Sequence, residues 1–245
     1  MLRQHTIGTY LKYQLLLSFL GLFLVISLTF FPPIITGDAT WRKPVIGSIF
    51  NIFCILGILA VFSPKKCGKI RYNKMEKGIP DSTKIEVQDD SPVLHGHHPT
   101  CGKFSAHIFR RKDRTFCAAC IGLLLGGLLA LAGSVVYFYC DWPFIEHSEI
   151  LVLVGSLWVS LGFFQFKFRS LIRLSSNALF VFGALLILIG IDTSIHNLSI
   201  DLLVMSLIVF WLLNRISLSQ WDHEIICSSC ETENCRVRTP KKREH

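Results

Sequence analysis

Charged side chains are scarce in this sequence of 245 residues. Asp, Glu, Lys and Arg make up 17% of the chain, whereas hydrophobic residues make up 51%. A soluble domain of this length rarely carries so few charges. The hydrophobic residues also form long runs instead of alternating with polar ones, which is typical of a membrane protein with several spans.

No long hydrophobic run carries Asp, Glu, Lys or Arg in its middle. Ion and proton pathways through a membrane usually need such groups, so a coupled transporter or pump is disfavoured. The sequence also lacks the Asp-His-His-Cys tetrapeptide of protein acyltransferases, the His-Glu-x-x-His of zinc proteases and a glycine-rich phosphate loop. These absences argue against each of those enzyme classes.

Six hydrophobic runs come close to the roughly 20 residues that a helix needs to cross a bilayer. The predicted spans are Leu15–Ile35, Val45–Phe62, Ile121–Tyr139, Ile150–Phe168, Asn177–Ile191 and Asp201–Leu218. The first is too long for the hydrophobic part of a signal peptide and no clean small-x-small cleavage site follows it, so we expect it to be retained. The fifth is the shortest, and its ends are the hardest to place. The expected fold class is an all-α integral membrane protein with about six transmembrane helices.

The distribution of Lys and Arg predicts the orientation. The loop Ser63–Cys120 contains twelve of them, whereas the connectors Cys140–Glu149 and Asp192–Ile200 contain none. Arg42 and Lys43, in the first connector, are an exception. With six spans, this distribution places both termini and the long loop in the cytoplasm of a multi-pass plasma membrane protein.

The chain therefore divides into four parts. They are an N-terminal pair of transmembrane helices (1–62), a basic cytoplasmic loop (63–120), a four-helix transmembrane region (121–218) and a cytoplasmic Cys-rich tail (219–245). The net charge of +8 mostly reflects the basic cytoplasmic segments. Such segments attract anionic lipid headgroups, so we expect the bilayer, its headgroups or a cytoplasmic protein as partners rather than nucleic acid.

The chain has nine cysteines, and six of them form two clusters in segments predicted to be cytoplasmic. These six are Cys101, Cys117, Cys120, Cys227, Cys230 and Cys235. Because the cytoplasm keeps thiols reduced, clustered cysteines there favour metal binding or redox chemistry over structural disulfides. Cys54 lies inside the second span, where we expect a buried thiol that acts as a small hydrophobic side chain.

The long loop has the pattern of a small zinc module. His98-Pro-Thr-Cys101-Gly has the form of a zinc knuckle in which His replaces the first Cys. The segment that follows predicts a short β-hairpin, and Cys117-Ala-Ala-Cys120 then leads into the third span. The first turn of a helix stabilises thiolates through its unpaired N–H groups and its dipole. This order resembles a treble-clef module, with His98, Cys101, Cys117 and Cys120 as the favoured tetrahedral ligands for zinc.

Three other histidines of the loop have open roles. His107 alternates with Phe109 in the predicted hairpin, so it is well placed to face the site. His95 and His97 are expected to be solvated. Each of the three remains an alternative to His98 as a ligand or a support for the site.

The tail contains a second group of potential ligands. His223, Cys227, Cys230 and Cys235 lie within 13 residues. They predict either a second zinc site or additional ligands for the zinc site of the loop. The alternative interpretation is a disordered tail with reduced thiols.

Residues 95–127 resemble the signature of an uncharacterised prokaryotic family of small multi-span membrane proteins. In that family a Cys/His-rich segment precedes Cys-x-x-Cys-x-Gly at the start of a transmembrane helix. The second half is matched by Cys117, Cys120, Gly122 and Gly126, and the first half by His98, Cys101 and His107. The family often has Thr at the position of Ile121 and Arg at the position of Ala119. The resemblance implies no established activity. Gly122 and Gly126 also form a small-xxx-small pair, which we expect to pack within the chain.

The leading functional hypothesis is a structural zinc site that orders the cytoplasmic loop for a partner or lipid. One alternative is a membrane thiol oxidoreductase that uses the Cys117/Cys120 pair. The others are a metal-dependent membrane hydrolase with an open zinc position and a metal sensor. Whether the protein is an enzyme stays open.

Overall fold

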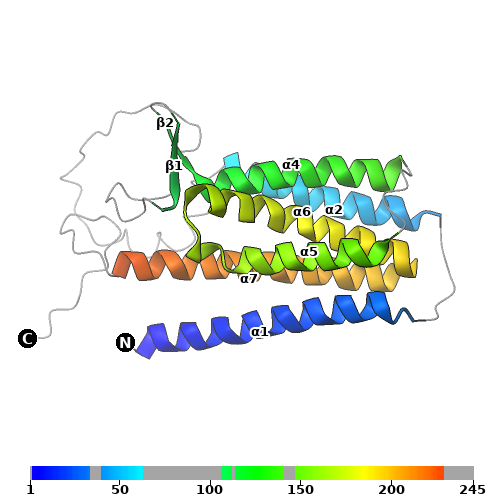
Figure 1. Cartoon of the computed structure of the whole chain (residues 1–245), viewed down its shortest axis with the longest axis horizontal. Coiled ribbons are helices and arrows are strands. Elements are labelled where there is room, and N and C mark those ends of the chain that lie inside the picture. The colour runs from blue at the N-terminus through cyan, green and yellow to red at the C-terminus, as the bar shows by residue number, and fades with distance from the viewer. Residues whose placement is uncertain (1, 34–39, 63–105, 112–113, 141–146, 229–245) are drawn as a thin grey trace, which may run out of the picture.

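A computed structural model describes residues 2–33, 40–62, 106–111, 114–140 and 147–228. Within these ranges, six helices lie lengthwise in one bundle (Figure 1), namely α1 (Leu2–Phe30), α2 (Arg42–Phe62), α4 (Ala118–Tyr139), α5 (Ser148–Phe163), α6 (Ser170–Ile195) and α7 (Leu198–Ser228). The strands β1 (Ile108–Arg111) and β2 (Arg114–Cys117) form an antiparallel hairpin, and the 3₁₀-helix η2 (Gln165–Lys167) joins α5 to α6. Helix α1 begins, and α7 ends, at the end of the bundle that carries the hairpin. We call this the hairpin end.

Among the described residues, five helices are long and hydrophobic enough to cross a membrane, namely α1, α2, α4, α6 and α7. Helix α5 has 16 residues, so it falls short of the about 20 that a perpendicular span requires. The prediction that the fifth span would be the shortest is wrong, because α6 has 26 residues. Its ends contain Arg173 and Asp192, whose side chains are buried among the other helices.

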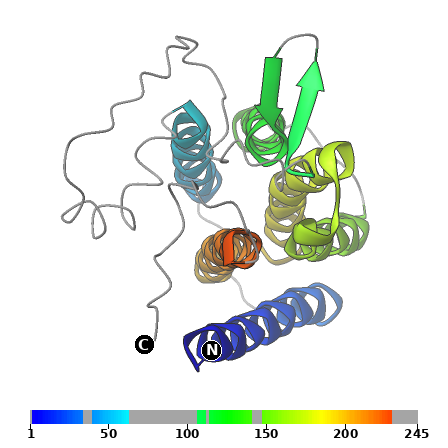
Figure 2. The ribbon, with the colours of Figure 1, turned by 90° about the vertical axis from the view of Figure 1, so that its left-hand side faces the viewer.

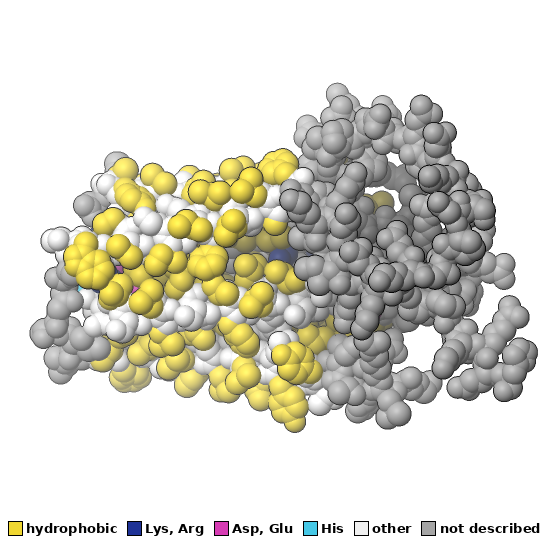
Figure 3. All heavy atoms as spheres, turned by 180° about the vertical axis from the view of Figure 1, so that it is seen from behind, with side chains coloured by type: hydrophobic (Ala, Val, Ile, Leu, Met, Phe, Trp, Pro, Cys, Tyr) yellow, Lys and Arg dark blue, Asp and Glu magenta, His cyan; other side chains and the backbone are white. Residues whose placement is uncertain are grey.

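Hydrophobic side chains are spread along the whole described part of the bundle face shown in Figure 3. Phe23, Leu129 and Leu157 each expose more than half of their surface. Exposed hydrophobic side chains in this number are favourable against lipid tails and unfavourable against water. The fold therefore agrees with an all-α, multi-pass membrane protein.

Helix α6 is the central helix of the bundle. In the end view of Figure 2 it lies beside α4 and α5, and it packs most extensively against these two. Glycines allow the close approach, as expected for Gly122 and Gly126. A Cβ atom at Gly126 would lie 2.6 Å from the carbonyl oxygen of Ala178 in α6. This pair therefore serves packing within the chain.

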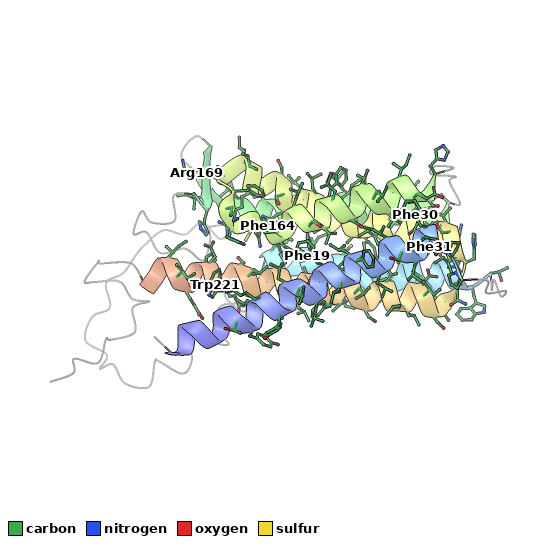
Figure 4. All side chains as sticks on the ribbon, turned by 60° about the horizontal axis from the view of Figure 1, so that its bottom comes forward. Phe19, Phe30, Phe31, Phe164, Arg169 and Trp221 are labelled. Atoms are coloured by element: carbon green, nitrogen blue, oxygen red, sulfur yellow. The ribbon has the colours of Figure 1, made fainter. Side chains whose placement is uncertain are left out.

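Helix α1 lies at the edge of the bundle, against α5 and α7. The ring centroid of Phe19 is 5.9 Å from that of Phe163 and 6.3 Å from that of Phe164. Phe19 and Phe164 are labelled in Figure 4. Asn214 of α7 donates a hydrogen bond of 2.8 Å from Nδ2 to Ser18 Oγ of α1. A polar bond of this kind fixes the rotation of a lipid-exposed helix against its neighbour.

The end of the bundle opposite the hairpin contains a buried ion cluster. The Arg42 guanidinium, at the start of α2, forms ion pairs with Asp192 of α6 and Asp201 of α7. The Tyr137 hydroxyl of α4 donates a hydrogen bond of 2.6 Å to Asp192. Arg42 and both carboxylates are almost fully buried. Arg42 is therefore an exception to the distribution of Lys and Arg that predicts the orientation, because it neutralises carboxylates inside the bundle.

Candidate functional site

The hairpin holds the first turn of α4 in a fixed position. Ile108 pairs with Cys117 in the antiparallel register. The backbone N–H of Ala118 donates a hydrogen bond of 3.0 Å to the carbonyl oxygen of His107. Cys117 is therefore the last residue of β2 and also the N-cap of α4, and Cys120 lies in the first helical turn. The predicted hairpin is present, and α4 begins directly after it.

His107 of the loop lies against the end of α7. Its side chain is buried, and its Nε2 lies 3.5 Å from Oδ2 of Asp222. The ring centroids of His107 and His223 are 5.2 Å apart. One histidine from the loop cluster and one from the tail cluster are thus in contact, although they are far apart in the sequence.

Helix α7 extends further than the sequence predicted. It continues to Ser228, so the first residues of the predicted tail form its last turns. The ring of Trp221, which is labelled in Figure 4, packs against that of Phe166 in η2, with their centroids 6.4 Å apart. This contact and the Asp222 interactions explain why the helix persists beyond the hydrophobic run that ends at Leu218.

Two buried arginines complete the hairpin end. Arg173 of α6 donates a hydrogen bond of 3.2 Å from Nη2 to Oδ2 of Asp222. Arg215 of α7 donates one of 3.1 Å from Nη2 to Oε1 of Gln165, and its guanidinium lies over the ring of Phe180 at 5.4 Å. Aromatic stacking is a common environment for a buried guanidinium.

The backbone N–H of Ser170, at the start of α6, donates a hydrogen bond of 2.9 Å to the carbonyl oxygen of Ala106. The start of α6 is thus fixed to the residue that precedes His107. The hairpin, α4, α6 and α7 therefore meet in one polar cluster, which we call the hairpin-end cluster.

The structure places some of the predicted site residues in this cluster. His107 and His223 are members, and Cys117 and Cys120 lie next to them at the start of α4. For Cys227 the described part is the backbone, in the last turn of α7. The remaining candidates lie outside the described residues, namely His95, His97, His98, Cys101, Cys230 and Cys235. Within the described ranges, no three His, Cys, Asp or Glu side chains are arranged to hold one metal ion.

The sequence did not indicate three members of the cluster, namely Asp222, Arg173 and Arg215. Arg215 carried a detectable signal, because it is a charged residue within a predicted span. Such residues usually face the protein interior and mark functional sites. Asp222 and Arg173 gave no comparable signal, since each lies in a polar stretch next to a span.

No family model, no curated protein and no solved structure matches this chain. The function therefore has to be argued from the hairpin-end cluster itself.

Proposed function

We propose that the hairpin end of this membrane protein carries a zinc site that orders the long basic loop. The proposed ligands are His98, Cys101, Cys117 and Cys120, which match the neutral imidazole and thiolates that structural zinc prefers. One observation carries the proposal. It is the contact of His107, beside Cys117, with His223 at the end of α7.

The donor chemistry supports the choice of metal. Cys117 is buried, so its thiol is protected from bulk water. Cys120 follows in the first turn of α4, where the helix dipole favours a thiolate. Zinc bound here would cross-link the loop to the start of α4 and so rigidify it. His107, His223, Cys227, Cys230 and Cys235 would orient the ligands or form a second site.

Metal content tests this proposal. We expect the purified full-length protein to contain about one zinc per chain or more, as structural tetrahedral sites do. The double variant Cys117→Ser with Cys120→Ser should lose at least one zinc, because it removes two of the four proposed ligands. Cys140→Ser is the matched control, since Cys140 is exposed at the opposite end of α4. Mass spectrometry of the metal content measures the result, and a zinc-free wild type would overturn the proposal.

We further propose that the hairpin end faces the cytoplasm of the plasma membrane, next to anionic headgroups. Because α4 carries the hairpin at one end and Cys140 at the other, this orientation places Cys140 outside the cell. A membrane-impermeant maleimide should then label the wild type on intact cells, and Cys140→Ser should abolish that label. Labelling of Cys140 that requires permeabilised cells would show that the orientation is reversed.

A membrane thiol oxidoreductase is the second candidate. It is favoured by one observation, the Cys-x-x-Cys at the start of α4. In that case the purified protein would be metal-free, and Cys117 and Cys120 would form a reversible disulfide under mild oxidant. A hydrolase or a metal sensor would instead bind zinc with an open or exchangeable position. The proposed kinship of residues 95–127 with the prokaryotic membrane family favours none of these activities.

A further inference from the structure

Two arginines are buried in the interface between α6 and α7. Arg173 of α6 exposes 1% of its surface, and Arg215 of α7 exposes 3%. Helix α6 packs extensively against α4 and α5 and only sparsely against α7. A buried charge is unfavourable unless a partner of opposite sign or a set of hydrogen bonds compensates it. Each guanidinium therefore needs a compensating group nearby.

The two arginines belong to one short stretch of this interface. At one end of the stretch, Arg173 donates its hydrogen bond to Asp222 of α7. At the other end, the guanidinium of Arg215 lies over the ring of Phe180 of α6. Phe180 follows Arg173 by seven residues, which is two helical turns or about 10 Å. Asp222 follows Arg215 by the same interval on α7. Because residues spaced in this way lie on one face of a helix, both arginines extend into the same part of the interface.

One carboxylate accompanies these two positive charges. Within the described ranges, Asp222 is the carboxylate that forms an ion pair with either arginine, and it pairs with Arg173 at 3.2 Å. Its Oδ2 atom is shared, since Nε2 of His107 lies 3.5 Å from the same oxygen. The side-chain partner of Arg215 is Gln165, which is neutral. The described part of the interface therefore has a surplus of one positive charge.

Several N–H groups of the arginines also lack an acceptor. Nε and Nη1 of Arg173 have no hydrogen-bond partner among the described residues, and the same holds for Nε of Arg215. Native proteins rarely leave buried donors unpaired, because each one costs free energy. Water would satisfy these donors but would add no charge. An anion with several oxygen atoms supplies both the acceptors and the missing negative charge.

We propose that this stretch of the α6–α7 interface binds one phosphate group through Arg173 and Arg215. The planar array of guanidinium donors matches the oxygens of a phosphate. Arg173 lies in the first turn of α6, at the end of a membrane span, and basic pockets between helices at this level of a membrane bind lipid headgroups. The phosphate belongs either to a lipid headgroup or to a soluble anion. The site needs none of the proposed zinc ligands.

Binding of inorganic phosphate to the purified, full-length protein in a non-ionic detergent tests for a soluble anion. Equilibrium dialysis with radiolabelled phosphate in a chloride buffer should show about one bound phosphate per chain. Arg215→Met keeps the length of the side chain and removes its charge. It should lower the affinity for phosphate about tenfold or more, the factor expected for a lost hydrogen bond to a charged group.

Arg169→Met is the matched control. It removes the same charge from α6, but Arg169 is exposed at the N-cap of this helix (Figure 4). This variant should bind phosphate as tightly as the wild type. An equal loss of affinity in Arg169→Met and Arg215→Met would show that phosphate binds through surface charge, which contradicts the proposal.

Phosphatidylglycerol, added in the same detergent, tests for a lipid headgroup. If the phosphate belongs to a headgroup, native mass spectrometry should show about one retained phosphatidylglycerol per wild-type chain, and free phosphate should not bind. Arg215→Met should lose this lipid, and Arg169→Met should keep it. Phosphatidylcholine is the matched lipid, because its headgroup has no net charge and should not be retained.

Arg215→Lys keeps the test decisive should Arg215→Met fail to fold. Lysine retains the buried charge but not the planar fork that bonds Gln165 and stacks on Phe180. It should therefore bind the phosphate or the lipid several-fold more weakly than the wild type. A wild-type protein that binds neither phosphate nor phosphatidylglycerol would overturn the proposal. Equal binding by the wild type and both Arg215 variants would also overturn it.

Discussion

Replacing Arg42 with leucine should destabilise the folded protein by about 3–5 kcal/mol, the usual result of removing one partner from a buried ion pair. The variant leaves Asp192 and Asp201 buried without the guanidinium that now pairs with both. It also separates three helices, since Arg42 belongs to α2 and the two aspartates to α6 and α7. We expect the midpoint of unfolding in a denaturing detergent, followed by circular dichroism, to fall far below that of the wild type.

Two further variants make this prediction specific. Lys43→Leu removes the same charge one residue later, where the side chain is half-buried and lies over the ring of Tyr137, and it should cost less than about 1 kcal/mol. The triple variant Arg42→Leu with Asp192→Asn and Asp201→Asn removes the carboxylates as well, and it should recover most of the stability. A stable Arg42→Leu single variant would show that the cluster is not a structural element.

Replacing Gly126 with leucine should cost about 3 kcal/mol, at the upper end of the range for overpacked interiors. A Cβ atom there would lie 2.6 Å from the carbonyl oxygen and 2.8 Å from the Cα of Ala178. Because these are backbone atoms, no rotamer change relieves the clash, and α4 and α6 would have to separate. We expect the midpoint of unfolding to be lower than that of the wild type. We also expect protease to cleave the variant faster at the hairpin, because its contacts with the bundle are weakened.

Gly57→Leu in α2 is the matched control, since a Cβ atom at Gly57 would meet no atom within 4 Å. This variant should unfold at the wild-type midpoint or slightly above it, because leucine favours helix more than glycine does. Equal midpoints for the two leucine variants would contradict the packing described for α4 and α6.

The spans could be predicted because a bilayer imposes their length and hydrophobicity. The ends of α6 could not, since Arg173 and Asp192 are polar residues whose burial depends on partners from other helices. The end of α1 is determined by the local sequence. The helix stops at Phe30, just before Pro32 and Pro33, which lack a backbone N–H.

Part of the candidate site could likewise be predicted from the sequence, and part could not. The hairpin and the Cys-x-x-Cys at the start of α4 follow from contiguous residues, so they could be predicted from their pattern. The contact between His107 and His223 depends on the packing of α7 beside α4 and α6. No local pattern encodes such a contact, and the ion pair of Arg173 with Asp222 could not be predicted for the same reason.

The zinc X-ray absorption spectrum of the purified, full-length protein tests the central claim most directly. A site built from His98, Cys101, Cys117 and Cys120 predicts three sulfur ligands at about 2.3 Å and one nitrogen ligand at about 2.0–2.1 Å. The double variant Cys117→Ser with Cys120→Ser should lose that sulfur shell. A wild-type spectrum with only nitrogen and oxygen ligands, or a protein without zinc, would contradict the proposal that the hairpin end is a zinc–thiolate centre.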